Sequence, residues 1–519
     1  LGNNPPRGGW HGFRASRAYR ANLATWLQGA GYRTIHIGKF LNHYGTDERP
    51  EPIVPPGWNV WQTDATDNSG RFFYGYTWNI DGRIAGPFGD PEYGQFKAVD
   101  RPGCFLAPVD DPGCNHKTDE ITRRAVDQIE IAAELPAPIY MQLDYNAPHG
   151  DHQPPIGPEP TPRNYGRADR TPIPRGPAFN EADVSDKPSF IRDHAERFGG
   201  FEMRRIRVEY RKSLESLRDV DDGVRRIIAT LRRTGELQNT YILFTSDNGF
   251  FRGEHRLDRA KFLPYEPAVR MPLLIRGPAI PPGIESEELS GNIDLAPTLL
   301  ELARARPTYP MDGRSLAPFW RDPERTTRRP ILLESFANAT AVEDAPGSGD
   351  PNPPTPPDGY TEPDTTGASA GTGRGGSAGT GRGGSAGASK GAGAGLGPSD
   401  GTGTGRAWRH EPGRGTVATA SIAAPVKNYG GVRLGRYKYV EYETGDIELY
   451  DLARDPHEIQ NRAGFPAYRW VQGFLAHQLR RLVKCSGREC KFRTGPIPLP
   501  GEPRAKLRWA PRQPLPPRR

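Results

Sequence analysis

The sequence predicts an α/β fold, a mostly parallel sheet flanked by helices, because three units of helix followed by strand succeed one another. Each unit joins a run with apolar residues at helical spacing to a short β-rich run, over residues 20–30 and 32–38, 118–134 and 139–144, and 203–233 and 241–244. Because the carboxyl ends of parallel strands meet at one edge of a sheet, we expect Lys39, His149 and Asp247 to lie together at that edge.

A smaller α+β subdomain is predicted toward the carboxyl end of the chain. Residues 431–442 alternate around Gly435 in the manner of an antiparallel hairpin, and residues 447–452 add a further strand. A helix over residues 470–483 closes this unit, which we place at 426–495.

The segment before this subdomain has a composition that does not form a core. Residues 341–425 are dominated by Gly, Ser, Ala, Pro and Thr, and the unit Gly-Thr-Gly-Arg-Gly-Gly-Ser-Ala occurs twice in tandem from Gly371. Such a segment buries too little apolar surface to offset roughly 1–2 kcal/mol of backbone entropy per residue. We therefore expect a disordered insert between a main domain over 1–340 and the subdomain.

Composition and charge exclude some classes of protein. The 519 residues carry a net charge of +7, but 69 Lys and Arg stand against 62 Asp and Glu, so we expect no nucleic-acid partner from this mild excess. The Pro- and Arg-rich tail over 496–519 is expected to be unstructured, or else to contact a polyanion. There is no apolar run of 18 residues, so no membrane span is expected, and no signal peptide precedes the first motif. The oligomeric state does not follow from the sequence.

The four cysteines form two close pairs, Cys104 with Cys114 and Cys485 with Cys490. Two short loops closed by disulfides would explain this pairing and would indicate an oxidising compartment. Zinc ligation fits less well because neither pair has Cys-x-x-Cys spacing, and reduced thiols remain an alternative.

An oxygen-rich turn follows the third predicted strand. Asp247 and Asn248 offer a carboxylate and an amide oxygen, which suit a hard cation such as Ca²⁺ or Mg²⁺, and Gly249 allows a sharp turn. The same three residues also make an ordinary turn, and on spacing alone that interpretation is favoured.

A series of motifs in a fixed order carries a resemblance to type I sulfatases, closest to bacterial N-acetylglucosamine-6-sulfatase-like enzymes. These motifs are Ile37-Gly38-Lys39-Phe40, Asn146-Ala147-Pro148-His149, Thr245-Ser246-Asp247-Asn248-Gly249, Gly253-Glu254-His255 and Pro264-Tyr265-Glu266 with the preceding Lys261. The resemblance covers nearly the whole chain apart from the insert and the tail. It implies an alkaline-phosphatase-like fold and sulfuric ester hydrolysis on a sulfated sugar or glycosaminoglycan, in an extracytoplasmic setting.

The resemblance also implies roles for individual residues. One calcium ion would be bound by Asp247 and Asn248, while Lys39 and Lys261 would neutralise sulfate oxygens. His149 would hydrogen-bond the sulfate or assist proton transfer. Without the resemblance, both lysines are read as solvated surface residues, and His149 as a solvated loop residue beside an equally plausible His152.

One departure from the family pattern concerns the nucleophile. Sulfatases of this type use a formylglycine made from Cys or Ser in a Cys/Ser-x-Pro-x-Arg motif, and these 519 residues contain no such motif. We therefore expect that the chain lacks an amino-terminal segment carrying the nucleophile and further metal ligands, and that these residues alone do not turn over a sulfate ester. The rival interpretations are a phosphodiesterase or phosphonate hydrolase of the same superfamily, and a noncatalytic binder of sulfated glycans.

Overall fold

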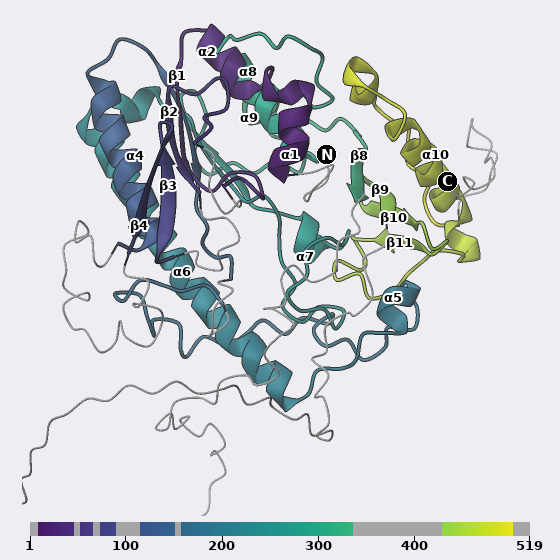
Figure 1. The fold of residues 1–519 in the computed structure, drawn as a ribbon. Coiled ribbons are helices and arrows are strands. Elements are labelled where there is room, and N and C mark those ends of the chain that lie inside the picture. Colours follow the sequence, from purple (N-terminus) through teal and green to yellow (C-terminus); the bar gives the residue numbers. More distant parts are fainter. Residues whose placement is uncertain are drawn as a thin grey trace, which may run out of the picture. The chain divides into compact units, whose positions relative to one another are not determined.

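The computed structural model describes residues 9–45, 52–65, 73–89, 115–150, 157–335 and 428–501. Within these ranges a central five-stranded sheet has the strand order β4-β3-β2-β1-β5 (Figure 1). Its strands are β1 (Arg33–Gly38), β2 (Val60–Asp64), β3 (Tyr76–Ile80), β4 (Arg83–Phe88) and β5 (Ile139–Asp144). β1 runs parallel to both β2 and β5, whereas β3 and β4 continue the sheet as antiparallel strands. The predicted α/β class is confirmed.

Of the helices in this part of the chain, α2 (Leu23–Gly29) and α4 (Lys117–Ala133) pack against the five-stranded sheet. The other α-helices of this part are α1 (Gly9–Ala15), α5 (Ser189–Arg192), α6 (Gly200–Arg233), α7 (Glu266–Val269), α8 (Leu295–Leu302) and α9 (Ala317–Arg321). Short 3-10 turns are η1 (Arg17–Tyr19), η4 (Glu236–Asn239) and η5 (Asn292–Asp294). The predicted helices at 118–134 and 203–233 correspond to α4 and α6, which pack against each other.

Local sequence explains where α2 begins and how α4 packs. The Asn22 side chain accepts from the backbone N–H of Thr25 at 3.1 Å, and the Thr25 hydroxyl accepts from the N–H of Asn22 at 2.9 Å, so the first turn of α2 is capped reciprocally. α4 places Ile121 and Ala125, one turn apart, in the same buried cluster as Ile35 of β1. Helical spacing of apolar residues therefore fixes the face that α4 turns toward the sheet.

The third predicted strand does not join this sheet. β6 (Ile242–Thr245) pairs antiparallel with β7 (Leu273–Arg276) in a separate two-stranded sheet, and no backbone hydrogen bond joins β6 to β5 in the described ranges. The expectation of one continuous parallel sheet through all three strands was therefore wrong for β6. The alternation of helix and strand sets the order of elements along the chain, but it does not determine which strand edges pair.

The carboxy-terminal unit contains a four-stranded antiparallel sheet in the order β11-β10-β9-β8. Its elements are β8 (Ile331–Ser335), β9 (Tyr429–Leu434), β10 (Tyr437–Tyr442), β11 (Ile447–Asp451), η6 (Pro466–Tyr468), α10 (Arg469–Leu482) and η7 (Gly487–Lys491). Gly435, at φ 55°, occupies the β9–β10 turn where the sequence predicts a hairpin. β8 precedes the predicted insert and still pairs with β9, so the main domain contributes a strand to this sheet.

Side chains of β10 alternate between two buried clusters. Tyr437 and Tyr439 pack with α10, whereas Val440 and Tyr442 pack on the other face with Tyr265, from the segment before α7. This period of two means that the four-stranded sheet separates α10 from α7, and Figure 1 shows the two helices on opposite sides of these strands.

The described residues include only part of what the sequence predicts for the cysteines, the insert and a membrane span. Cys485 and Cys490 form a disulfide with a Cα–Cα distance of 5.1 Å, which settles the alternatives for this pair. Cys104, Cys114 and the insert at 341–425 lie outside the described residues. Within those residues, no helix has the length and apolar composition needed to cross a bilayer.

Candidate functional site

The carboxyl ends of β1 and β5 form the first part of the site. Gly38 lies opposite Asp144 in register, and the next residue, Lys39, donates its backbone N–H to the carbonyl of Asp144 at 2.8 Å. Gly38 has φ 115°, and a Cβ there would lie 2.1 Å from the Asp144 carbonyl oxygen, so only glycine fits. The Lys39 ammonium donates to Oδ1 of Asn42 at 3.1 Å. The predicted position of Lys39, at the carboxyl edge of the parallel strands, is therefore what the structure shows.

A row of hydrogen-bonded polar side chains ends at Asp144, and the sequence did not predict it. The imidazole of His36 is fully buried, with Nδ1 at 2.7 Å from the Thr63 hydroxyl and Nε2 at 3.1 Å from Oδ2 of Asp144. The Gln142 amide donates to the same carboxylate oxygen at 2.8 Å. These contacts orient the Asp144 carboxylate at the strand end. The available signal was the alternation of polar side chains along β5, which places Gln142 and Asp144 on one face.

The turn after β5 carries His149. Its backbone N–H donates to the Asn146 carbonyl at 2.8 Å, and its ring Nδ1 lies 2.8 Å from the Gly150 carbonyl. A carbonyl oxygen only accepts, so Nδ1 carries a proton, and in the neutral ring Nε2 keeps its lone pair. The Asn146 side chain is buried, and within the described residues neither its amide nitrogen nor its oxygen has a hydrogen-bond partner. His152, the alternative to His149, lies outside the described residues.

Asp247 and Asn248 form the turn after β6. Oδ1 of Asp247 accepts from the backbone N–H of Asn248 at 2.9 Å, and the Asn248 amide donates to the Gly249 carbonyl at 2.8 Å. Gly249 donates to the Ala268 carbonyl at 2.8 Å, and a Cβ on it would lie 2.0 Å from the Pro267 carbonyl oxygen. The turn interpretation is thus correct as local structure, and the turn places Asp247 and Asn248 next to α7.

The donor chemistry of this turn fits a hard cation in part. The exposed Asp247 carboxylate and the Asn248 amide oxygen are the donor types that calcium prefers, but calcium takes about six to eight oxygens. Within the described residues, no group of three or more His, Cys, Asp or Glu side chains is placed to hold a metal ion. Asp247 and Asn248 therefore remain two proposed ligands, with the other donors unassigned.

Lys261 ends a loop that is fastened to α6. The half-buried Lys261 follows Ala260, whose carbonyl accepts from the Phe251 N–H at 2.9 Å. At the base of the loop, Arg252 and Arg259 both donate to the carboxylate of Glu209, which is 2% exposed. Burial raises the pKa of Glu209, but the guanidiniums of Arg259, Arg252 and Arg205 outweigh it and hold this pKa below its usual value.

A second buried network lies under the same segment. His255 Nδ1 is 2.7 Å from Oε2 of Glu181, and its ring lies 4.5 Å from the Tyr265 ring. The Tyr265 hydroxyl donates to Glu448 of the carboxy-terminal sheet at 2.7 Å, and Lys438 of that sheet pairs with Glu266 at 2.8 Å. The role of His255 is therefore local support, and the carboxy-terminal unit holds the residues that follow Lys261.

The candidate residues fall into two neighbouring groups. Lys39 and His149 follow the paired strands β1 and β5, whereas Asp247 and Asn248 lie in the turn bonded to α7, and Lys261 precedes α7 in the chain. The two groups approach each other near Glu209. A Cβ on Gly150, next to His149, would lie 3.7 Å from Gly157, and one on Gly157 would lie 3.5 Å from the Glu209 Cγ. Sequence patterns did not indicate Glu209, because an isolated Glu on a long helix is ordinarily expected to be exposed to solvent.

Comparisons with known proteins show the family and the fold of the chain. Residues 3–305 match the family model described as Sulfatase. The N-acetylglucosamine-6-sulfatase of Homo sapiens is 31% identical over 319 residues, which is 60% of this chain and 52% of that protein. Across three curated relatives, the chain spans between 37% and 52% of their length.

Two solved structures share the fold. A protein in complex with its substrate D-glucosamine-2-N,6-O-disulfate has a TM-score of 0.56 at 20% identity, covering 91% of this chain and 82% of that one. A phosphonate monoester hydrolase from Silicibacter pomeroyi has a TM-score of 0.51 at 18% identity, covering 91% and 81%.

Proposed function

We propose, from the premise that this chain belongs to the sulfatase family, that the protein as its gene encodes it hydrolyses sulfate esters of sugars. The observation that carries the proposal is the placement of Lys39 at the carboxyl edge of β1 and β5, beside the turn that carries His149. Ligands of α/β proteins collect at this edge, and a fixed cation there meets the charge of a sulfate group.

The residues present have definable roles in this reaction. The ammonium groups of Lys39 and Lys261 balance the negative charge of the sulfate oxygens, which grows as the ester bond breaks. Nε2 of His149, the nitrogen opposite the Gly150 contact, accepts or returns a proton at the ester oxygen. Calcium, when bound by Asp247 and Asn248, would supply a Lewis acid to the sulfate oxygens.

The proposed substrate is a sulfated sugar, with N-acetylglucosamine 6-sulfate as the first compound to test. Support comes from the human relative named N-acetylglucosamine-6-sulfatase and from the related fold solved with a sulfated glucosamine. An extracytoplasmic location is proposed with it, because the Cys485–Cys490 disulfide is typical of oxidising compartments.

The test measures sulfate release from N-acetylglucosamine 6-sulfate by the protein as its gene encodes it. Lys39→Ala and Lys261→Ala should each lower kcat/KM by about 10²- to 10³-fold, as expected for loss of a group that stabilises developing charge. Arg232→Ala, which removes an exposed cation on α6, is the matched control and should leave kcat/KM unchanged.

The same assay separates the rival functions. A higher kcat/KM on a phosphonate monoester than on the sulfate ester would favour the phosphonate hydrolase alternative. Binding of the sulfated sugar without sulfate release by the gene-encoded protein would favour a noncatalytic binder. Either result would overturn the proposal.

A further inference from the structure

The end of α10 and the segment after it carry an unusual excess of positive charge. Residues 480–493 contain six Arg or Lys residues and a single acidic residue, Glu489. The exposed cations here, together with one from the main domain, form what we call the basic surface: Arg328, Arg481, Lys484, Arg488, Lys491 and Arg493. None of the six forms an ion pair within the described ranges.

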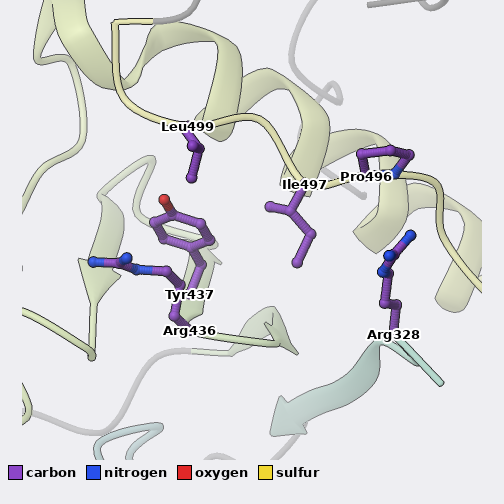
Figure 2. A pocket seen from close by; sticks show the side chains of 6 residues that line it. All are labelled: Arg328, Arg436, Tyr437, Pro496, Ile497 and Leu499. Carbon is purple, nitrogen blue, oxygen red and sulfur yellow. The ribbon is translucent and has the colours of Figure 1, made fainter. Parts of the chain in front are cut away.

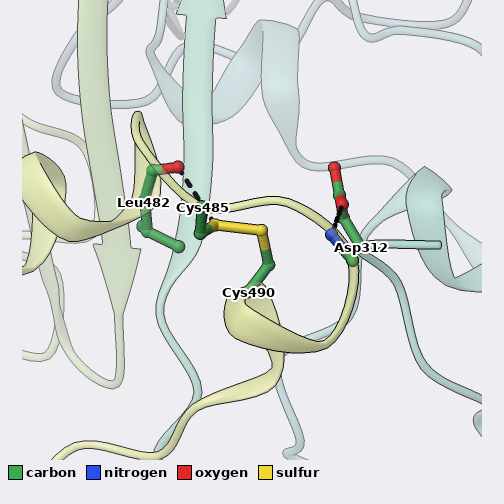
Figure 3. The surroundings of a disulfide bond; sticks show 5 residues. Asp312, Leu482, Cys485 and Cys490 are labelled. Atoms are coloured by element: carbon green, nitrogen blue, oxygen red, sulfur yellow. Dashed lines mark hydrogen bonds between the residues drawn. A yellow bond between two sulfur atoms is a disulfide. The ribbon is translucent and has the colours of Figure 1, made fainter. Parts of the chain in front are cut away.

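Three contacts hold these cations on one surface. The Cys485–Cys490 disulfide ties the end of α10 to η7 (Figure 3). Arg488 therefore lies inside the closed loop, and Lys484 and Lys491 flank its two cysteines directly. The guanidinium of Arg481 lies 3.6 Å from the centre of the Phe492 ring. Thr494 donates both its N–H and its hydroxyl to the carbonyl of Arg328 at 3.2 Å, which places Arg328 beside Arg493.

The cations are close enough to affect one another. Partial burial lowers the pKa of Lys491, and the guanidiniums of Arg329 and Arg488 lower it further, against the opposing effect of Asp294 and Asp312. The pKa of His477 on α10 is likewise lowered, by partial burial and then by Arg481 and Arg480. Repulsion of this kind is relieved when an anion binds.

A hollow of about 390 Å³ adjoins the basic surface, lined by Arg328, Arg436, Tyr437, Pro496, Ile497 and Leu499 (Figure 2). Arg436 is already paired with Asp451, whereas Arg328 is exposed. The hollow therefore combines apolar walls with a cation, which together match a sugar ring that carries an anionic group.

The basic surface and the segment that follows Lys261 lie on opposite faces of the four-stranded sheet. α10 packs on the Tyr437 and Tyr439 face of the four-stranded sheet, while Tyr265 and α7 pack on the face of Val440 and Tyr442. A ligand on the basic surface would thus be separated by this sheet from the segment that follows Lys261, so the basic surface is distinct from the site of Lys261.

We propose that the basic surface is a docking site for a sulfated polysaccharide, which holds a long substrate while one of its sugars is processed elsewhere. The proposal rests on the proposed function for the identity of the polyanion. Nucleic acid fits less well, because base stacking needs exposed aromatic rings, whereas Tyr437 is buried and Phe492 is covered by Arg481.

The experiment titrates heparin, as the sulfated polymer, against the full chain and two triple variants. Lys484→Glu with Arg488→Glu and Lys491→Glu should weaken binding by roughly tenfold or more, and the loss should shrink as salt is raised. The matched control introduces the same charge change at three exposed arginines of α6, Arg204→Glu, Arg218→Glu and Arg232→Glu, and should change the affinity far less. Melting temperatures confirm that both variants are folded. Arg328→Gln tests the hollow without a charge reversal and should weaken binding about twofold or more.

Several outcomes would overturn the proposal: equal losses in the two triple variants, equal affinity for desulfated heparin, or tighter binding of DNA of matched charge. Failure of the proposed function gives a different result. In that case the gene-encoded protein would release no sulfate, while the selective loss of heparin binding in the first triple variant would persist.

Discussion

Arg252 donates to the buried carboxylate of Glu209 at 2.7 Å, across 43 positions of sequence, and joins the loop before Lys261 to the middle of α6. The second guanidinium nitrogen of Arg252 donates to the Ser213 hydroxyl at 2.9 Å, one turn further along the helix. Arg259 reaches the same carboxylate from the other end of the loop. One carboxylate therefore closes the loop that presents Lys261.

The first prediction concerns this carboxylate. Glu209→Gln keeps the shape but leaves the partly buried guanidiniums of Arg252 and Arg259 without a counter-charge, so it should lower the free energy of unfolding by roughly 3 kcal/mol near pH 7. Because the folded pKa of Glu209 lies below its usual 4.5, its stabilisation is complete above that pH and is lost as pH falls through the folded pKa. Denaturant titration across pH 3 to 7 would measure this.

Two results decide this prediction. Glu236→Gln, at an exposed carboxylate in η4, is the control and should change stability by less than about 0.5 kcal/mol. If Glu209→Gln matched the parent at pH 7, the carboxylate would not be holding the loop.

The second prediction concerns Glu448, which accepts hydrogen bonds from Tyr265 at 2.7 Å, Tyr442 at 2.6 Å and Tyr450 at 2.5 Å. Burial raises its pKa, and the tyrosine hydroxyls only partly oppose this. A carboxyl group whose pKa is raised in the folded state stabilises the protein below its ordinary pKa of 4.5. This stabilisation is lost as the pH rises through the folded pKa.

Glu448→Gln has no carboxyl group to ionise, so the variant should not lose stability in this way as the pH rises. The free energy of unfolding of the variant, relative to the parent, should increase as pH rises from 4 to 8. Thermal or denaturant unfolding at several pH values measures the difference. A constant difference over that range would show that Glu448 has the same pKa in the folded and unfolded chain.

The third prediction concerns the close approach of Gly249 to α7. A Cβ at this position would lie 2.0 Å from the Pro267 carbonyl oxygen, a backbone atom that moves only with the helix. Gly249→Ala should therefore destabilise the protein by about 1–3 kcal/mol. Gly29→Ala at the end of α2 meets no atom within 4 Å and should be neutral or slightly stabilising. A similar melting temperature for both variants would contradict the packing of the Asp247 turn against α7.

Elements with strong local periodicity were predictable from the sequence. The strand predicted at 139–144 is β5, and the helices predicted at 118–134 and 203–233 are α4 and α6 to within three residues. The hairpin around Gly435 also follows from local pattern. In each case the signal lies in residues that are neighbours along the chain, and apolar spacing reports it directly.

Pairings between distant residues were not predictable in this way. β6 pairs with β7, and β8 joins a sheet whose other strands begin at Tyr429, although nothing in their local pattern distinguishes these edges. The buried carboxylates of Glu209 and Glu448 are the same kind of case, since each is buried only because partners from far along the chain surround it. The candidate residues Lys39 and His149 were found because motif order, not periodicity, indicated them.

The last prediction separates metal binding from charge stabilisation in the gene-encoded protein. Asp247 offers a formal negative charge and Asn248 a neutral oxygen, so Asp247→Ala should weaken calcium binding by roughly tenfold or more, and Asn248→Ala by less. Lys261→Ala should leave calcium affinity unchanged while lowering sulfate-ester hydrolysis, because its ammonium acts on the sulfate and not on the ion. Calcium titration beside rate measurement distinguishes these roles, with Asp221→Ala at an exposed carboxylate of α6 as the control for lost charge. If Asp247→Ala bound calcium and hydrolysed substrate like the parent, the Asp-Asn-Gly segment would be an ordinary turn, held against α7 by the Gly249 contact alone.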